Sequence, residues 1–303
     1  MRRLFTLGLS LLSLSLPLLA QADMATAMQA MEDPSHPLLL LRTSRGDLYV
    51  ELFPESAPRN VANFIALAEA QVPMFDIATS SQVNPHYYDN KTFFRILRHY
   101  LVQAGAPRTT EEAAPEYYVD DEISAKALGL NDMKVLDETG ALHPWLNIKD
   151  KEGFEAELLL PLYRKLNITT PADVETRQYD ILKTLQNMTL RQAYENQGYT
   201  YNDRLAPRTP IRGSLAMASS GPNRNRSEFF MLLQDAPWLS GKATIIGTVV
   251  EGMEIVDRID QAAVLRGDST EATPTTATMI FDVRQLNTTT TQATSTQQPS
   301  ALQ

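Results

Sequence analysis

The sequence predicts a mostly β protein, an antiparallel barrel with two flanking helices, together with a separate helical segment. Short apolar runs of strand length recur along the chain, and only two helical patterns accompany them, which is typical of a barrel. A third region, in the middle of the chain, has helix caps and helical periodicity instead. The apolar runs span residues 38–53, 92–103, 213–217, 227–233, 244–250 and 277–283.

The first run predicts a β-hairpin. The turn sequence Ser-Arg-Gly-Asp at 44–47 separates two apolar stretches. After it, Leu48, Val50 and Leu52 occupy every second position, so they share one face of a strand. The hairpin therefore has one buried face.

Two amphipathic helices are expected on the barrel. Pro58 is a favoured first helical residue, and apolar residues follow at the spacing of a helix face. The pattern predicts a helix over 58–70, and a second helix is expected over 255–262. The apolar positions of the first are Val61, Phe64, Ile65 and Ala68.

The run TFFRILRHYLVQ at 92–103 mixes polar and apolar residues. As one regular strand it would place Arg95, Gln103 and several apolar side chains on the same face, unless a bulge intervenes. Strands that line a cleft have this mixture, and so do edge strands with solvated arginines. Both interpretations stay open from the pattern alone.

Composition excludes some functions. The formal net charge of −9 argues against nucleic acid or an anionic membrane as the partner. There is no cysteine, so there is no disulfide. Residues 1–22 have the basic start, apolar centre and Ala-Gln-Ala end of a cleaved signal peptide, which predicts a periplasmic protein with no membrane span after cleavage. Residues 23–37 are expected to be a flexible lead and 287–303 a disordered tail.

Three segments, in the same order, resemble the cyclophilin family. The stretch RTSRGDLYVELFPESAPRNVANFIALA resembles its first hairpin and helix, and FFRILRHYLVQAG its active-site strand. GSLAMASSGPNRNRSEFFMLL, followed by WLSGKATIIGTVVEGMEIVDRI, resembles its second signature. The resemblance implies a closed antiparallel β-barrel built from 38–123 and 200–286, and peptidyl-prolyl cis-trans isomerase activity without a cofactor or metal.

The resemblance also assigns the site. Arg95 matches the catalytic arginine and Gln103 the glutamine that steadies it. Trp238 stands where drug-sensitive relatives present an indole N–H, so a cyclosporin-type ligand is expected to bind, although weakly, because Ala243 and Arg226 depart from the family pattern. The positions that match substrate contacts are Tyr100, Leu101, Ala218, Ser219, Phe230, Trp238 and Leu239. Further departures are Phe94 for a histidine and Glu228 for a glutamine.

Residues 124–199 have no counterpart in the resemblance and are expected to be a helical insertion outside the catalytic machinery. One helix is predicted over 153–166, interrupted near Pro161. Another is predicted to begin with the cap Thr170 and Pro171 and to stop at Gly198. Their apolar stripes either pack against each other or form a surface for clients.

Two functions therefore remain. The first is an isomerase that acts on proline-containing segments of exported proteins and assists their folding in the periplasm. The alternative is a weakly catalytic chaperone or interaction protein of the same fold that binds clients through the helical insertion. Metal-dependent hydrolysis is disfavoured, because the four histidines lack metal-binding spacing. They are His36, His86, His99 and His143.

Overall fold

The computed structural model describes residues 22–265, 271–274 and 277–286. The predicted signal peptide, apart from Ala22, and the predicted C-terminal tail lie outside these residues. In the described part of the chain, no helix has the length and apolar character that crossing a membrane requires.

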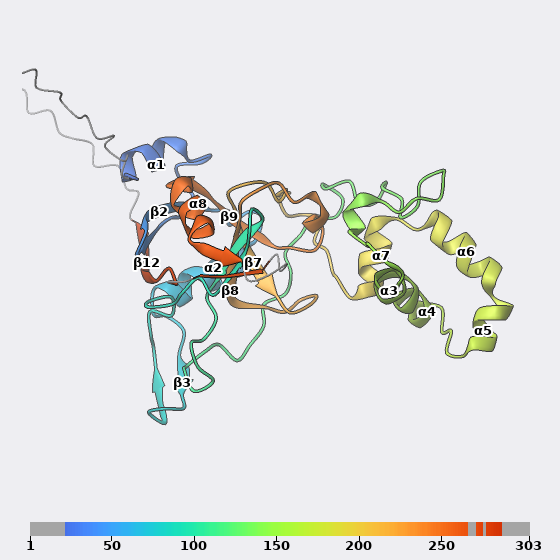
Figure 1. The fold of residues 1–303 in the computed structure, drawn as a ribbon, viewed down its shortest axis with the longest axis horizontal. Coiled ribbons are helices and arrows are strands. Elements are labelled where there is room, and N and C mark those ends of the chain that lie inside the picture. The colour runs from blue at the N-terminus through green and yellow to red at the C-terminus, as the bar shows by residue number, and fades with distance from the viewer. Residues whose placement is uncertain (1–21, 266–270, 275–276, 287–303) are drawn as a thin grey trace, which may run out of the picture.

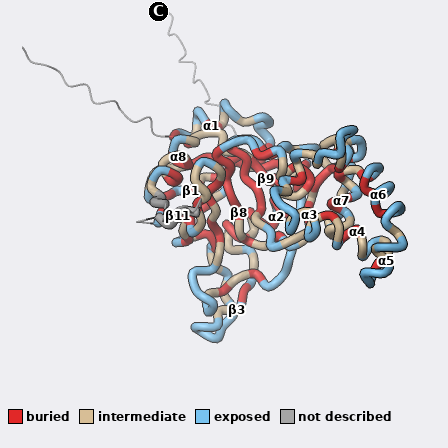
Figure 2. Tube along the Cα trace, turned by 45° about the vertical axis from the view of Figure 1, so that its right-hand side comes forward, coloured by how far each residue is buried: buried red, intermediate tan, exposed pale blue. Residues whose placement is uncertain are grey.

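An antiparallel sheet forms the centre of the molecule (Figure 1). It is wrapped around a large apolar cluster, visible as the buried segments of Figure 2. In spatial order its strands are β10 (Ala263–Leu265), β11 (Glu271–Pro274), β5 (Arg95–Leu97), β6 (Leu101–Ala104), β8 (Asn225–Leu232), β7 (Ser214–Ser219), β9 (Ile245–Glu251), β2 (Gly46–Leu52), β1 (Leu38–Thr43) and β12 (Ile280–Leu286).

The described strands do not form a closed barrel, so this part of the prediction is wrong. The continuous ladder runs from β10 to β12, and the chain before β5 meets β12 at one isolated bridge, Thr92 with Met279. Ile280 N donates to Lys91 O at 2.7 Å on one side of the bridge. On the other side, Phe93 N donates to Thr278 O at 3.0 Å, and the N–H of the next residue, Phe94, donates instead to Gln103 O at 3.1 Å.

The predicted hairpin at 38–53 is confirmed as β1 and β2, with Leu39 opposite Val50. The run 92–103, in contrast, is two short strands rather than one. His99 adopts a positive φ of 60°, and Tyr100 N donates to Leu97 O at 2.9 Å, which closes a tight turn between β5 and β6. The alternation expected for one straight strand therefore does not apply across this turn.

The two predicted flanking helices are present as α2 (Pro58–Ala68) and α8 (Met253–Gln261). Residues 23–37 differ from the expected flexible lead, because they contain α1 (Met24–Ala30). The Asp23 carboxylate caps this helix, and Ala27 is buried in a small cluster with Leu38 and Tyr49. A separate two-stranded sheet, β3 (Met74–Asp76) and β4 (Ser81–Val83), projects below the main sheet in Figure 1.

The middle of the chain is helical and lies to one side of the sheet (Figure 1). Thr170 and Asp173 form the expected capping box, but the single helix predicted from there to Gly198 is wrong, because the chain breaks after Thr176 and again at Met188, where Thr189 caps a new helix. Gly198 ends that last helix in a left-handed conformation. A π-helical turn precedes Pro161, where an interruption was predicted. The elements are η1 (Pro144–Leu146), α3 (Lys151–Phe154), the π turn η2 (Glu155–Leu159), α4 (Leu160–Lys165), α5 (Pro171–Thr176), α6 (Gln178–Asn187) and α7 (Leu190–Gln197).

These helices have an apolar core of their own. It includes Leu130, Leu158, Leu162, Leu185 and Tyr194, and it is distinct from the clusters beneath the sheet. The apolar stripes of the helices thus do pack on each other in part, as one of the two interpretations of the sequence expected.

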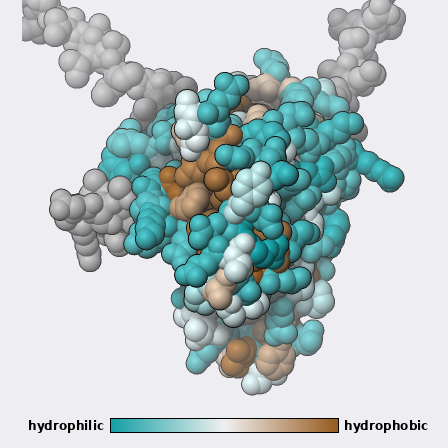
Figure 3. Space-filling view, turned by 90° about the vertical axis from the view of Figure 1, so that its right-hand side faces the viewer, coloured by the Kyte–Doolittle hydropathy of each residue, from teal (hydrophilic) through white to brown (hydrophobic). Residues whose placement is uncertain are grey.

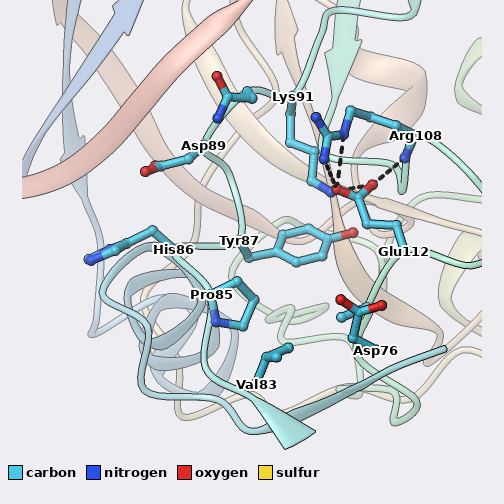
Figure 4. Close-up of a pocket in the computed structure, with 11 residues that line it drawn as sticks. Asp76, Val83, Pro85, His86, Tyr87, Asp89, Lys91, Arg108 and Glu112 are labelled. Carbon is cyan, nitrogen blue, oxygen red and sulfur yellow. Dashed lines mark hydrogen bonds and ion pairs between the residues drawn. The ribbon is translucent and has the colours of Figure 1, made fainter. Parts of the chain in front are cut away.

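A buried ion pair stabilises the loop that follows β6. The Lys91 ammonium is almost fully buried, lies 2.8 Å from the Glu112 carboxylate and contacts the face of the Tyr87 ring (Figure 4). Arg108 also binds Glu112. Burial raises the pKa of Glu112, but the hydrogen bonds from Lys91 and Arg108 outweigh it, and the net pKa is below the usual value. Lys91, Glu112 and Arg108 line a cavity of about 390 Å³.

Replacing Glu112 with Gln is expected to lower the free energy of unfolding by about 3 kcal/mol at neutral pH, because it leaves a buried ammonium without its carboxylate. The lowered pKa of Glu112 means that its contribution is present above the usual value of 4.5 and is lost as the pH falls through the lower pKa of the folded protein. Urea unfolding at neutral pH and at about pH 3 measures both effects.

The control is the pair Lys91→Met with Glu112→Gln, which removes both charges and should recover part of the lost stability. A difference between wild type and Glu112→Gln that stays constant down to acid pH would contradict this account.

Candidate active site

Backbone pairing brings the central site residues into one row across the sheet. Arg95 on β5 lies opposite Gln103 on β6, Gln103 opposite Phe230 on β8, and Phe230 opposite Ala216 on β7. Residues directly opposite each other in an antiparallel ladder point to the same face, with Cβ atoms about 4.5 to 5.5 Å apart. An arginine, a glutamine and a phenylalanine from distant parts of the chain thus share one surface.

A polar chain of two consecutive side-chain hydrogen bonds fixes the orientation of the Arg95 guanidinium. Arg95 Nη1 donates to Gln103 Oε1 at 3.2 Å, and Gln103 Nε2 donates to Glu228 Oε2 at 2.7 Å. A guanidinium can only donate and a carboxylate can only accept, so these two partners allow a single orientation of the Gln103 amide. Glu228, which the sequence marks only as a departure from a common glutamine, therefore helps to hold Arg95 through Gln103.

An apolar surface, called the apolar wall below, lies beside these hydrogen-bonded side chains. Leu101 and Phe230 are buried, at 6% and 8% exposure, and they belong to a cluster separate from the main core. Of the predicted substrate contacts, six lie in this cluster and Ser219 does not. The six are Tyr100, Leu101, Ala218, Phe230, Trp238 and Leu239. Phe229, on the opposite face of β8, is fully buried in the main core, as expected from the alternation.

Tyr100 and Trp238 bind each other at the edge of the wall. The indole Nε1 of Trp238 donates to the Tyr100 hydroxyl at 3.0 Å, and the ring centroids are 5.7 Å apart. Burial raises the pKa of Tyr100, and the hydrogen bond from Trp238 and the charge of Arg95 oppose that shift. The indole N–H thus has a partner within the protein, one that a phenylalanine at position 100 would not supply.

A hollow of about 280 Å³ is lined by Gln103, the residue that accepts the hydrogen bond from Arg95. Ser219 is exposed and lines it, together with Gln103, Ala218 and Glu228. Tyr118, which is not among the predicted site residues, lines it too, and the Arg226 guanidinium lies 4.6 Å from the centroid of its ring. The stretch YYVDDEI at 117–123 resembles a strand of the family, but that resemblance does not mark Tyr118 as a site residue.

The loop that carries Ser219 is anchored by a buried carboxylate. Asp121 accepts hydrogen bonds from Asn223 N at 2.7 Å, Asn225 Nδ2 at 2.9 Å and Thr244 Oγ1 at 3.2 Å. Burial raises the pKa of Asp121, and these hydrogen bonds oppose the shift. The Gly-Pro-Asn-Arg-Asn sequence therefore has a defined conformation at the edge of the site.

The site holds a fixed cation beside an apolar surface, with no nucleophile set against a base. In the described part of the chain, no group of three histidine, cysteine or acidic residues lies close enough to bind a metal ion. Such an arrangement can bind an apolar ring and donate hydrogen bonds to an adjacent carbonyl or amide nitrogen.

Comparison with known proteins is consistent with this geometry. Residues 38–284 match the family model of cyclophilin type peptidyl-prolyl cis-trans isomerases. Peptidyl-prolyl cis-trans isomerase B of Streptomyces anulatus is 25% identical over 221 residues, 72% of this chain and 81% of that protein. The isomerase CYP18-2 of Arabidopsis thaliana is 26% identical over 235 residues, 77% of this chain and 85% of that protein.

Other matches differ in extent. Peptidyl-prolyl cis-trans isomerase 9 of Schizosaccharomyces pombe is 26% identical over 222 residues, which are 73% of this chain but only 21% of that protein. A crystal structure of a cyclophilin type isomerase of Cryptosporidium parvum aligns with a TM-score of 0.45 and 19% identity, covering 83% of this chain and 98% of that chain. The family model spans most of the described residues, and the chain belongs to the cyclophilin-type peptidyl-prolyl cis-trans isomerase family.

Proposed function

We propose that this protein catalyses rotation about X-Pro peptide bonds and that Arg95 is its catalytic residue. The observation that carries the proposal is the Arg95 guanidinium, oriented by Gln103 and lying beside the apolar cluster of Phe230 and Leu101. The family shows the reaction, and this geometry supports the proposal that these side chains carry it out.

The energies explain why both parts are needed. An X-Pro bond rotates over a barrier of about 18 to 20 kcal/mol, and a 10⁴- to 10⁵-fold acceleration requires about 5.5 to 7 kcal/mol of that barrier. One hydrogen bond to a charged group supplies about 1.5 to 3 kcal/mol. The remainder comes from the exclusion of water from the amide by the apolar surroundings, which strengthens the contact of Arg95 with the twisted state.

Arg95 acts on the twisted amide. As the C–N bond turns, its resonance is lost and the nitrogen lone pair becomes localised, so a donor aimed at the prolyl amide binds the twisted state more strongly than the planar one. Gln103 and Glu228 hold the guanidinium, and Phe230, Leu101, Tyr100 and Leu239 contact the ring. Ala218 and Ser219 bind the residue before proline. No proton is transferred, so no acid or base is required.

The substrates we propose are proline-containing segments of exported proteins in a bacterial periplasm. The support is the sequence pattern of residues 1–22. We also propose that the helical region 124–199 is an insertion between the two halves of the isomerase domain, because the family's motifs lie on either side of it.

One observation favours an added client-binding function. The helical region carries an apolar groove of about 510 Å³ between α4 and α5, lined by Leu160, Tyr163, Ile168, Pro171 and Val174 among others. Figure 3 looks onto this end of the molecule, where hydrophobic areas lie within a mostly hydrophilic face. If the Arg95→Ala variant suppresses the aggregation of an unfolded protein as well as wild type does, client binding is separate from catalysis.

Arg95→Ala is expected to lower kcat/KM at least about tenfold, which corresponds to about 1.4 kcal/mol of transition-state stabilisation. The measurement is a proline-isomerisation assay with a short peptide on residues 23–303, with circular dichroism as the check on folding. Arg42→Ala, which removes a half-exposed arginine on β1 that pairs with Asp282 at the other end of the sheet, is the control. Undiminished turnover in a folded Arg95→Ala protein would rule out the assignment.

Glu228→Ala is expected to lower kcat/KM about three- to tenfold, because Gln103 loses the acceptor that orients its amide toward Arg95. Glu228→Gln keeps an oxygen acceptor at that position and should retain most of the activity. The two variants are compared in the same peptide assay. Equal activity of Glu228→Ala and wild type would show that Gln103 needs no such support.

Tyr100→Phe is expected to tighten binding of a cyclosporin-type ligand at least about threefold, because the indole N–H of Trp238 is released from the Tyr100 hydroxyl. Titration calorimetry compares this variant with wild type, and Trp238→Phe, which has no donor, serves as the control. A Tyr100→Phe protein that binds no better than wild type would show that the Tyr100 hydroxyl does not compete with the ligand for the indole N–H of Trp238.

A further inference from the structure

The loop 237–243 lies between two apolar cores. On one side it carries Trp238 and Leu239, which belong to the apolar cluster of the candidate site. On the other side its backbone meets the helical region, and η3 (Pro237–Leu239) packs beside η1. The loop is thus the place where the helical region approaches the proline pocket.

The contact is close at Gly241. This residue has a φ of +83°, and a Cβ atom placed on it would lie 2.5 Å from Leu130 Cδ1 and 3.2 Å from the ring of Tyr194. Only a residue without a side chain allows the backbone to approach that near. Leu130 and Tyr194 are both fully buried in the core of the helical region.

Polar contacts fix the same point. The Tyr201 hydroxyl donates to Gly241 O at 2.9 Å, and the Lys242 ammonium lies 5.2 Å from the centroid of the Tyr194 ring. Tyr201 in turn packs against the helical core, and Arg191 lies over its ring at 5.6 Å. The loop carbonyl is therefore held by a side chain that the helical region itself positions.

We propose that Leu130, Tyr194 and Tyr201 are positioning residues for the proline pocket, acting through Gly241 on Leu239 and Trp238. This role rests on the proposed isomerase function and runs against the expectation that residues 124–199 lie outside the catalytic machinery. The wall formed by Leu239 and Trp238 is supported from behind by the helical region, and loosening that support moves the wall.

The contact of Trp238 and Leu239 with the proline ring determines which kinetic constant their displacement changes. They contact the ring in both the planar and the twisted state, so displacing them weakens both equally and raises KM while kcat is retained. A variant that only destabilises the fold lowers the concentration of active enzyme instead. That loss appears in the apparent kcat and leaves KM unchanged.

The test compares two pairs of variants in the peptide isomerisation assay. Tyr201→Phe removes only the hydroxyl, and its control, Tyr179→Phe, changes an exposed tyrosine on α6. Leu130→Ala opens a cavity against Gly241, and its control, Leu185→Ala, opens one in the same core on α6. We expect KM to rise about threefold or more in Tyr201→Phe and Leu130→Ala, and to stay at the wild-type value in both controls.

A second measurement does not depend on activity. The chain has two tryptophans, so the indole N–H signals in a ¹H–¹⁵N spectrum are Trp145 and Trp238, and Trp145→Phe identifies them. The Trp238 signal should shift in Tyr201→Phe and stay in place in Tyr179→Phe. Unchanged KM and an unchanged Trp238 signal in Tyr201→Phe and Leu130→Ala would overturn the proposal. If the wild type proves inactive, the proposed function fails, and the Trp238 signal alone decides whether the helical region positions the wall.

Discussion

The register of one antiparallel ladder determines the candidate site. Arg95, Gln103, Phe230 and Ala216 lie opposite one another across β5, β6, β8 and β7. Side chains alternate between the two faces of a strand. A slip of β8 by one residue would therefore put Phe229 in the place of Phe230, and a slip of β6 would turn Gln103 away from Arg95. The polar chain and the apolar wall therefore exist only in this register, and the packing of Phe229 in the main core helps to fix it.

The tight turn between β5 and β6 is supported from the opposite side of the sheet. Asp260 on α8 accepts a hydrogen bond from His99 N at 3.1 Å and pairs with Arg98 at 3.3 Å. The carboxylate is almost fully buried, so the pair is poorly screened by solvent. A helix that contributes no residue to the site thus holds the turn that places Arg95 opposite Gln103.

The insertion proposed for the helical region would have a small entropic cost. Loop closure costs only about 0.6 kcal/mol for each doubling of length, so a segment with its own core adds little entropic cost. The helical region meets the loop before β9 at Gly241, which lies close to Tyr201, Tyr194 and Leu130. This contact matters because the same loop carries Trp238 and Leu239.

The sequence by itself determined the local structure: the β1–β2 hairpin, helix α2 with Pro58 at its start and the capping box at Thr170. These depend on residues close together in the chain. It also marked the family's motifs. Tertiary structure alone decided the break of 92–103 into a hairpin, the open ladder and the partners of Gln103 and Gly241. Gln103 and Glu228 are 125 positions apart, and no local periodicity encodes which distant backbone pairs with which.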